Sequence, residues 1–562
     1  NPFAGPILAW IQDPPLDARR TMRTIRLLPL LATLLLAARV EAQSGQPSVT
    51  YRKSDFADGH RLTRLHRGLN FTILGEGLQW DDDVPADADF YSVAADPDFR
   101  TLMSELDLGS VRIPGGAESN YHDWSDREAW VNWAVDHDRP HNATVDWDAW
   151  WSFHEAIGRP DIVTTANPFT DGNPATEGLL PAEVNGEWVA SYARERGIRG
   201  ALWEAGNETY IGDLVPGMDF TTGGRRDPLS YPSRASELAD AVHAADPDAR
   251  VGLVVYEHGT RTSWCRTDTL LSDVEMYGDL SDFDFLVLHD YAPLVPREEA
   301  SGERLFRSAG VAKTLAYLDL VHPVRDLEAL AGGRPIHVTE FGVLFDDGGR
   351  NWVSGWYDRG VALLLMYHWL DLVDQGADGL WFWDAVSKWF RLVDPTTSPP
   401  RPTGAYRILD RLHALRGSVR AGRVDGGPTF RVKGPIGTGL WEGEPDSSAW
   451  YLARSSSEPA VAVDQLRSFA AWDRARKRIQ VVLMNFGDEG AQVDVALDGF
   501  GLGAGLAFDR WVLRSTGGWN DALGEPVVRR MVKTAACVGT TATLESVQVP
   551  RRSAVVLEIP VR

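Results

Sequence analysis

Two glutamates at the ends of short apolar runs form a candidate catalytic pair. Glu208 ends the run Ala201-Leu-Trp-Glu-Ala-Gly-Asn-Glu, and Glu340 ends the run Ile336-His-Val-Thr-Glu. Hydrolysis of a glycosidic bond with retention needs one carboxyl that protonates the leaving oxygen and a second, roughly 5 to 5.5 Å away, that attacks the anomeric carbon. The pair therefore predicts a glycoside hydrolase that uses no metal or other cofactor.

The two glutamates must come from elements that end at a common site. Between about residues 62 and 415, short apolar runs alternate with amphipathic stretches, which is typical of a parallel sheet covered by helices. The runs predict eight strands, at 69–74, 110–113, 161–166, 200–204, 251–256, 283–289, 336–340 and 379–383. Eight strand and helix units predict an α/β fold of the (β/α)₈ or TIM barrel type, in which catalytic groups lie at the C-terminal ends of the strands.

Amphipathic helices are expected between and after these strands. The stretches that fit this pattern are 97–106, 147–157, 184–196, 231–244, 311–320, 356–375 and 406–415. Several predicted strands also end in polar residues, including Arg112, Asn207, His289, Tyr291 and Asp384. Since the C-terminal strand ends of a barrel surround one opening, these side chains are expected to lie around the two glutamates.

The sequence changes character after residue 418. From about residue 420, strand-like runs alternate with Gly-rich turns, which predicts an antiparallel β-sandwich. These runs are 449–453, 479–486, 491–497, 507–513, 541–549 and 553–559. We therefore expect a catalytic barrel over 62–418 and a β-sandwich over 419–562, with an N-terminal strand region at 43–61 that could join the sandwich.

The N-terminal region predicts export. A short basic start at Met22, an apolar stretch over 27–38 and small residues up to Ala42 are typical of a signal peptide. The apolar stretch is shorter than the about 20 residues that cross a bilayer. We expect a signal peptide over 22–42 that is cleaved after Ala42, no membrane association, and a secreted or periplasmic protein; residues 1–21 are expected to be upstream sequence outside the fold.

The composition limits the possible partners. The 562 residues are 44% hydrophobic and 24% charged, which is normal for a globular protein of two domains. The formal net charge of −23 disfavours nucleic acid, because phosphate backbones are bound by dense Lys and Arg surfaces. A neutral polysaccharide or oligosaccharide is not repelled, and the 22 tryptophans supply flat faces for sugar rings as well as for the core. The sequence does not indicate an oligomeric state.

Disulfides and metals have few candidate residues. The two cysteines, Cys265 and Cys537, fall in different predicted domains, so two separate thiols are expected, and no metal site can be built from cysteine. The acidic run at 81–83 could hold calcium, although a solvated acidic loop is the simpler interpretation.

The barrel motifs resemble those of known enzymes. Asn207-Glu208 after the fourth strand, with Glu340 after the seventh, resembles the clan of retaining glycosidases on (β/α)₈ barrels. Val111-Arg-Ile-Pro-Gly-Gly, followed by Tyr121-His-Asp-Trp, is similar to the second-strand motif of the α-L-arabinofuranosidase family, whose barrel is also followed by a β-sandwich. The run Thr339-Glu-Phe-Gly is closer to β-glycosidases and endo-β-glycanases of the clan, so the reaction class is better supported than the substrate.

The resemblance implies roles for the site residues: Glu208 would be the general acid/base and Glu340 the nucleophile. Asn207 would bond the sugar 2-hydroxyl, while Arg112 and Tyr291 would hydrogen-bond Glu340 and keep it ionised. Trp383 would be a stacking platform beneath the sugar. The other candidate substrate-binding or supporting residues are His289 and Trp124.

Two functions of other classes stay open. His258, His337 and the pair His289-Asp290 suggest a metal-dependent barrel hydrolase, but they form no ordered ligand motif. The second alternative is a catalytically silent carbohydrate-binding protein on a hydrolase scaffold. Glu204, close to Glu208 in the sequence, is expected to form a structural salt bridge.

Overall fold

The structure is a computed structural model that describes the main elements of the chain beyond the N-terminal region. Pro47–Arg562 forms one compact unit. The predicted signal peptide, the acidic run at 81–83, Trp124, His258, Cys265 and the predicted strand at 449–453 lie outside the described residues. The described residues are 45–71, 90–116, 119, 130–131, 143–144, 147–166, 168, 182–198, 200–209, 231–255, 270–271, 274–275, 279–293, 297–298, 304–344, 356–386, 390–433 and 459–561.

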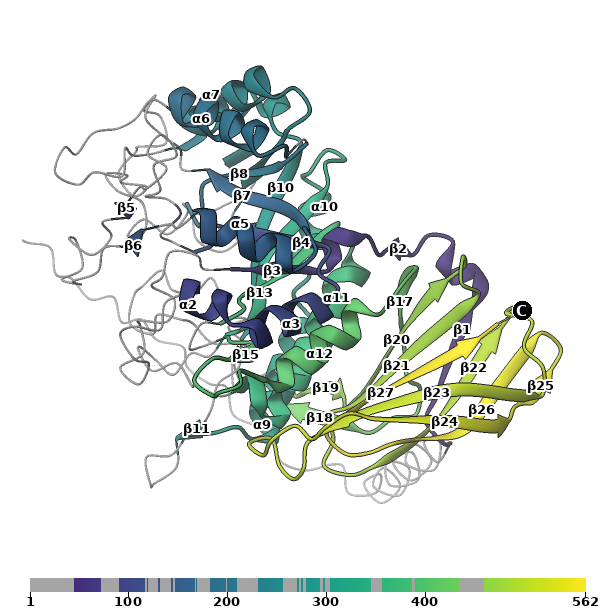
Figure 1. Cartoon of the computed structure of the whole chain (residues 1–562). Coiled ribbons are helices and arrows are strands. Elements are labelled where there is room, and N and C mark those ends of the chain that lie inside the picture. The colour runs from purple at the N-terminus through teal and green to yellow at the C-terminus, as the bar shows by residue number, and fades with distance from the viewer. Residues whose placement is uncertain are drawn as a thin grey trace, which may run out of the picture. The chain divides into compact units, whose positions relative to one another are not determined.

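Eight parallel strands form a closed barrel, as the sequence predicts (Figure 1). The order around the barrel is β10-β13-β14-β3-β4-β7-β8-β9. Barrel strands that follow each other along the chain therefore lie side by side, and the last of them, β14, closes the barrel against the first, β3. Their side chains are almost all buried, because the strands have the barrel interior on one face and helices on the other. The strands are β3 (Gly68–Asn70), β4 (Ser110–Ile113), β7 (Asp161–Ala166), β8 (Leu202–Ala205), β9 (Arg250–Val254), β10 (Phe285–Pro293), β13 (Ile336–Leu344) and β14 (Gly379–Phe382).

The sixth and seventh barrel strands run further than the sequence predicts. β10 continues to Pro293 and β13 to Leu344, and the two pair in parallel over that whole length. A register shift between Leu288 and His289 places His289 directly beside Glu340. Tyr291 and Glu340 are therefore held within strands rather than in the loops that follow them.

The helices cover the barrel strands, and most agree with the predicted stretches. α3 illustrates the local signals: Asp96 accepts from the backbone N–H groups of Asp98 and Phe99, and Pro97 opens the helix. The helices are α2 (Phe90–Ala95), α3 (Pro97–Glu105), α5 (Trp147–Ala156), α6 (Ala182–Glu195), α7 (Tyr231–Ala245), α9 (Ser308–Leu318), α10 (Pro323–Glu328), α11 (Leu363–Gln375) and α12 (Gly404–His413). Among the residues with assigned structure, no helix has the length and apolarity needed to cross a membrane.

One predicted helix is wrong in its first half. The stretch 356–375 begins with two short 3₁₀ turns, and α11 starts only at Leu363. The backbone N–H groups of Gly360 and Val361 donate to the carbonyls of Asp521 and Trp519, at 2.9 and 3.2 Å, instead of to their own helix. Contact with a distant loop therefore replaces the first helical turns.

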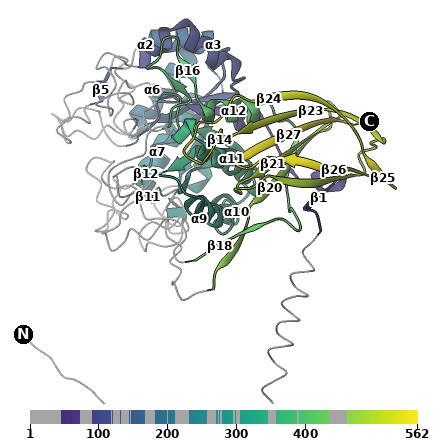
Figure 2. The same cartoon turned by 90° about the horizontal axis from the view of Figure 1, so that it is seen from below.

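Two sheets, antiparallel except for the pair of β1 with β22, form the predicted β-sandwich (Figure 2). The longer sheet has the order β2-β17-β20-β21-β27-β23-β24, and the shorter has the order β1-β22-β26-β25. Their strands are β2 (His60–Arg61), β17 (Ser418–Gly422), β20 (Leu466–Asp473), β21 (Arg478–Asn485), β27 (Ser553–Pro560), β23 (Gly505–Arg514), β24 (Val527–Thr534), β1 (Ser48–Arg52), β22 (Ala491–Asp498), β26 (Thr541–Val549) and β25 (Ala536–Val538). Short two-stranded ribbons are β5 (Trp130–Val131) with β6 (Ala143–Thr144), β11 (Arg297–Glu298) with β12 (Arg304–Leu305), β15 (Val393–Asp394) with β16 (Arg401–Pro402), and β18 (Thr429–Val432) with β19 (Val461–Asp464).

The segment before the barrel contributes to both sandwich sheets. β1 pairs in parallel with β22, and β2 pairs antiparallel with β17. Val49 and Tyr51 of β1 are buried in the apolar cluster between the sheets, and the Tyr51 hydroxyl lies 2.6 Å from Ser468 Oγ of β20. The two strands that precede the barrel in the described part of the chain therefore belong to the sandwich.

The barrel and the sandwich share a continuous apolar contact. Trp511 of β23 and Val556 of β27 belong to the same buried cluster as the barrel helices. At the edge of this contact, Arg411 of α12 binds Glu558 of β27 and stacks over the ring of Trp511. Burial of apolar surface therefore stabilises the contact, and the arginine adds a directed polar pair.

Candidate active site

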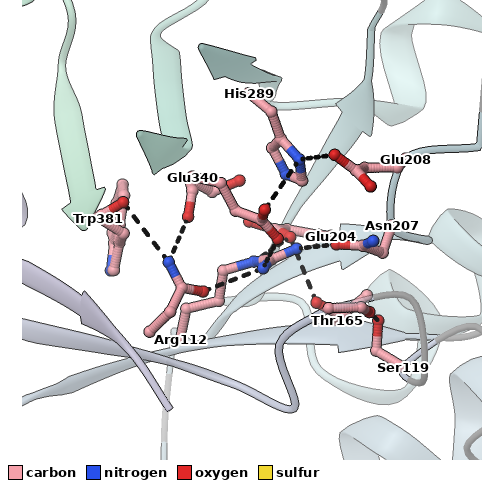
Figure 3. A network of polar contacts seen from close by, with 12 residues as sticks. Arg112, Ser119, Thr165, Glu204, Asn207, Glu208, His289, Glu340 and Trp381 are labelled. Atoms are coloured by element: carbon pink, nitrogen blue, oxygen red, sulfur yellow. Dashed lines mark hydrogen bonds and ion pairs between the residues drawn. The ribbon is translucent and has the colours of Figure 1, made fainter. Parts of the chain in front are cut away.

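The C-terminal strand ends bring several of the predicted polar residues together (Figure 3). Arg112 comes from β4 and Glu340 from β13, while His289 and Tyr291 both come from β10. Asn207 and Glu208 follow β8 directly. Because the strands are parallel, side chains far apart in the sequence meet at one end of the barrel.

Glu340 accepts hydrogen bonds from Arg112 and Tyr291, the two donors that the family resemblance implies. It is 3% exposed, and Arg112 Nη1 donates to Glu340 Oε1 at 2.7 Å. The Tyr291 hydroxyl donates to Glu340 Oε2 at 2.6 Å, and His289 Nδ1 lies 3.5 Å from the same oxygen. Both carboxylate oxygens are thus fixed in direction before any ligand arrives.

Glu208 faces Glu340 across a short gap. Its side chain is 20% exposed, and its Oε1 lies 3.2 Å from His289 Nδ1. One carboxylate oxygen of Glu208, one of Glu340 and a ring nitrogen of His289 all lie within 4.8 Å of one another. Glu208 reaches this position from a sharp turn, in which Gly206 has a φ of 93° and Glu208 itself a φ of 43°, a left-handed value that is uncommon outside glycine.

Arg112 connects most of the polar side chains in the site. It is fully buried, and its Nε donates to Glu204 Oε2 at 2.7 Å while its Nη2 donates to Asn207 Oδ1 at 2.7 Å. Glu204 does form an ion pair, as the sequence suggests, but its partner is the arginine that also binds Glu340. Glu204 therefore belongs to the polar network of the site (Figure 3).

Asn70 is a part of this network that the sequence analysis missed. Its Oδ1 accepts from Arg112 Nη1 at 3.0 Å, and its Nδ2 donates to the carbonyl of Thr339 at 2.8 Å. It thereby ties β3 and β4 to the residue that precedes Glu340. The available signal was an amide side chain inside an otherwise apolar strand, because such a group is buried only when it has partners.

Trp383 lies at the site beside a glycine of the second-strand motif. It is partly buried and follows β14, and a Cβ atom at Gly115 would lie only 2.8 Å from its ring and 3.3 Å from Asn70 Oδ1. Only glycine allows the backbone to approach the ring this closely. Trp124, the other tryptophan predicted to contribute, lies outside the described residues.

Several neighbouring groups shift the pKa of Glu340, some upwards and some downwards. The pKa of Glu340 is raised, because burial and the charge of Glu208 outweigh the lowering by Arg112, by the Tyr291 hydrogen bond and, when it is protonated, by His289. The ionised form of this buried carboxyl therefore depends on its cationic and hydrogen-bonding neighbours. Burial also lowers the pKa of His289 to about 4, so this ring is neutral near neutral pH.

A metal ion has one possible set of ligands here. Within the part of the chain that the structure describes, Glu208, His289 and Glu340 are the group of acidic and imidazole donors close enough to share an ion. Arg112 already pairs with Glu340, which weakens the attraction of that carboxylate for a second cation. His337, which the metal-hydrolase alternative invoked, lies instead against the rings of Phe285 and Trp381.

The chain is similar in structure to solved proteins, although it matches no family model and no curated protein in sequence. The chain is similar in structure to a thermostable α-L-arabinofuranosidase from Thermotoga petrophila, with a TM-score of 0.61 and 14% identity over 91% of this chain and 100% of that one. It is also similar to the α-L-arabinofuranosidase of Thermotoga maritima (TM-score 0.60, 14% identity, 91% and 99% covered) and to a family 51 α-L-arabinofuranosidase of Bifidobacterium longum (TM-score 0.60, 14% identity, 92% and 100% covered).

These similarities extend over nearly the whole of each chain. At 14% identity they establish a common architecture, a (β/α)₈ barrel with a β-sandwich, and they agree with the resemblance found in the sequence motifs. What the site does must be argued from its own residues.

Proposed function

We propose that the protein is a glycoside hydrolase that acts by double displacement, with Glu340 as nucleophile and Glu208 as general acid/base. The observation that carries the proposal is that one carboxylate oxygen of Glu208 and one of Glu340 lie within 4.8 Å of each other. Retaining enzymes have their carboxyl groups about 5 to 5.5 Å apart, whereas inverting enzymes need roughly 6.5 to 9.5 Å to accommodate a water molecule. The short gap supports direct attack by a glutamate.

In the first step, Glu340 attacks the anomeric carbon while the bond to the leaving oxygen breaks. Glu208 transfers its proton to that oxygen, so the leaving group departs as an alcohol and Glu208 becomes a carboxylate. The Tyr291 and Arg112 hydrogen bonds aim the Glu340 oxygens. Asn207, whose Oδ1 accepts from Arg112, would bond the sugar 2-hydroxyl.

In the second step, Glu208 takes a proton from water, whose oxygen then bonds to the anomeric carbon. The ester bond to Glu340 breaks, and the carboxylate returns to its Arg112 partner. The neutral His289 ring suits both steps, because its Nδ1 lies against Glu208 and can donate to the carboxylate or accept from the acid.

For the substrate we propose an α-L-arabinofuranoside in a plant or algal polysaccharide or oligosaccharide. The motif around Arg112 and the three α-L-arabinofuranosidases with the same architecture support this choice. A β-glycosidase or endo-β-glycanase of the same clan is the alternative, supported by the run Thr339-Glu-Phe-Gly. Trp383 would stack on the sugar in either case.

The test is a panel of 4-nitrophenyl glycosides, comprising α-L-arabinofuranoside, xyloside, glucoside, galactoside and glucuronide. The first product, followed by NMR, should keep the anomeric configuration of the substrate. Glu340→Gln should abolish turnover with the fold intact, and Glu208→Ala should lower the rate by about 10² to 10⁴, least for substrates with good leaving groups. Inverted product, or wild-type activity in Glu340→Gln, would refute the assignment.

A matched control comes from Asp378, which precedes β14 and lies beside the start of β13, at the opposite end of that strand from the site. Asp378 accepts from the backbone N–H of Ile336 at 2.9 Å, so Asp378→Asn makes the same acid-to-amide change beside the start of β13 and should leave turnover unchanged. Sugar binding without turnover across the panel would favour a silent carbohydrate-binding protein. Loss of activity on chelation, restored by a divalent metal, would favour the metal-dependent hydrolase.

Export is part of the same proposal. Cleavage of the predicted signal peptide after Ala42 would deliver the enzyme to extracellular polysaccharide. Protein recovered outside the cells of the source organism should begin at Gln43, and N-terminal sequencing would show this directly.

A further inference from the structure

Arg112 serves two buried carboxylates, of which only one has a place in the proposed reaction. Its Nε binds Glu204 and its Nη1 binds Glu340, both at 2.7 Å, and all three side chains are at least nine-tenths buried. The two contacts use different edges of one guanidinium group, whose charge is delocalised over its three nitrogens. The arginine therefore divides its charge between two anions.

Glu204 has no other cation near enough to pair with it among the described residues. Its Oε2 accepts from Arg112 and, at 3.3 Å, from Thr165 Oγ1 of β7. Its Oε1 is buried and makes no hydrogen bond to any described residue. The negative charge of Glu204 therefore neutralises part of the positive charge of Arg112.

This division changes what Arg112 does for Glu340. With an undivided cation, a buried carboxylate is stabilised so strongly that it becomes a weaker base and a weaker nucleophile. A second carboxylate on the same guanidinium reduces that stabilisation without moving the donors. The same contact also fixes the guanidinium plane, so that Nη1 and Nη2 remain directed at Glu340 and Asn207.

We propose that Glu204 is a positioning residue that orients Arg112 and, by sharing its charge, keeps Glu340 a reactive carboxylate. This inference rests on the proposed glycosidase function and deepens it. The groups that act directly on the ionisation of Glu340 are Arg112 from β4, His289 and Tyr291 from β10, and Glu208 after β8, so we infer that Glu204 acts through Arg112.

The direction in which the acidic limb of kcat/KM shifts in a Glu204 variant distinguishes two roles for Glu204: sharing the charge of Arg112, or only holding Arg112 in place. Glu204→Gln keeps the shape and the contact to Nε but removes the competing charge, so Arg112 acts on Glu340 alone. The acidic limb of kcat/KM, where Glu340 takes up a proton, should then move down by about one pH unit. If Glu204 only held Arg112 in place, its replacement would loosen the arginine and move the limb up.

The experiment uses 4-nitrophenyl α-L-arabinofuranoside, or the most active glycoside of the panel. A good leaving group needs little protonation, so the acidic limb reports Glu340 rather than Glu208. The plateau rate of Glu204→Gln should also fall, by about 10-fold, because a more stable carboxylate attacks more slowly. Thr165→Val is the matched control, since it removes the other hydrogen bond to Glu204 while the charge stays, and it should leave the limb in place.

A second variant covers the case in which Glu204→Gln does not fold. Glu204→Asp keeps the charge but draws it away from Arg112, so the limb should move down by less than in Glu204→Gln. An acidic limb that stays in place or moves up in either folded variant overturns the inference. A wild-type protein that hydrolyses no glycoside of the panel refutes the proposed function instead, so the two failures are distinguishable.

Discussion

The hydroxyl of Tyr291 offers the sharpest test of how the site controls Glu340. It donates to Glu340 Oε2 at 2.6 Å, and its ring packs against Phe390 with centroids 5.8 Å apart. Tyr291→Phe therefore removes the hydrogen bond and retains the ring packing. The change isolates one donor to the proposed nucleophile.

The magnitude follows from the strength of a hydrogen bond to a charged group. Such a bond is worth about 1.5 to 3 kcal/mol, and one pKa unit corresponds to about 1.4 kcal/mol. The bond stabilises the ionised form of Glu340, so its loss adds to the rise in pKa that burial already causes. Activity requires the ionised form, which is lost as pH falls, so the acidic limb of kcat/KM should move up by about 1 to 2 pH units.

The assay is a pH profile of kcat/KM with a 4-nitrophenyl glycoside, together with circular dichroism to confirm the fold. Tyr406→Phe is the control, because Tyr406 is as buried as Tyr291 but donates to the carbonyl of Leu102, away from the site. The control should leave the limb unchanged. A limb that does not move in Tyr291→Phe, whatever happens to the rate, would show that the hydroxyl does not support the charge of Glu340.

Two further variants test whether Trp383 stacks on the sugar and how the buried His337 affects stability. Gly115→Ala would put a methyl group 2.8 Å from the Trp383 ring and should raise KM about 10-fold by displacing it, which steady-state kinetics would show; an unchanged KM would exclude Trp383 as the sugar platform. His337 is buried between the rings of Phe285 and Trp381, and burial lowers its pKa to about 3, so it stays neutral in the folded state while the unfolded chain takes up a proton below pH 6.5. Its contribution to stability is therefore lost as pH falls from 6.5 towards 3, and His337→Phe should flatten the acid side of the urea-unfolding profile by up to about 1.4 kcal/mol per pH unit; an identical slope would contradict this.

The barrel could be predicted because its strands are short apolar runs with clear limits. Ser110–Ile113 and Asp161–Ala166 begin and end where the sequence indicates. The run Asp290-Tyr-Ala-Pro looks like a loop, since it mixes polar residues with proline, yet it continues β10 because β13 pairs with it along its whole length. Local patterns do not encode such a partner.

The site could be predicted where motif and strand end coincide, and not where the contact is long-range. Glu208, Glu340, Arg112 and Tyr291 lie together as the sequence implies, although their catalytic roles remain predictions. Asn70 was missed because nothing local indicates that its partners lie on β4 and β13.

The early position of β1 in the sandwich has consequences for how the polypeptide is made. Its hydrogen-bonding partner, β22, is synthesised more than 400 residues later, so this pairing cannot form until nearly the whole chain has left the ribosome. Deletion of β1 would accordingly damage the C-terminal sheets and leave the barrel strands complete.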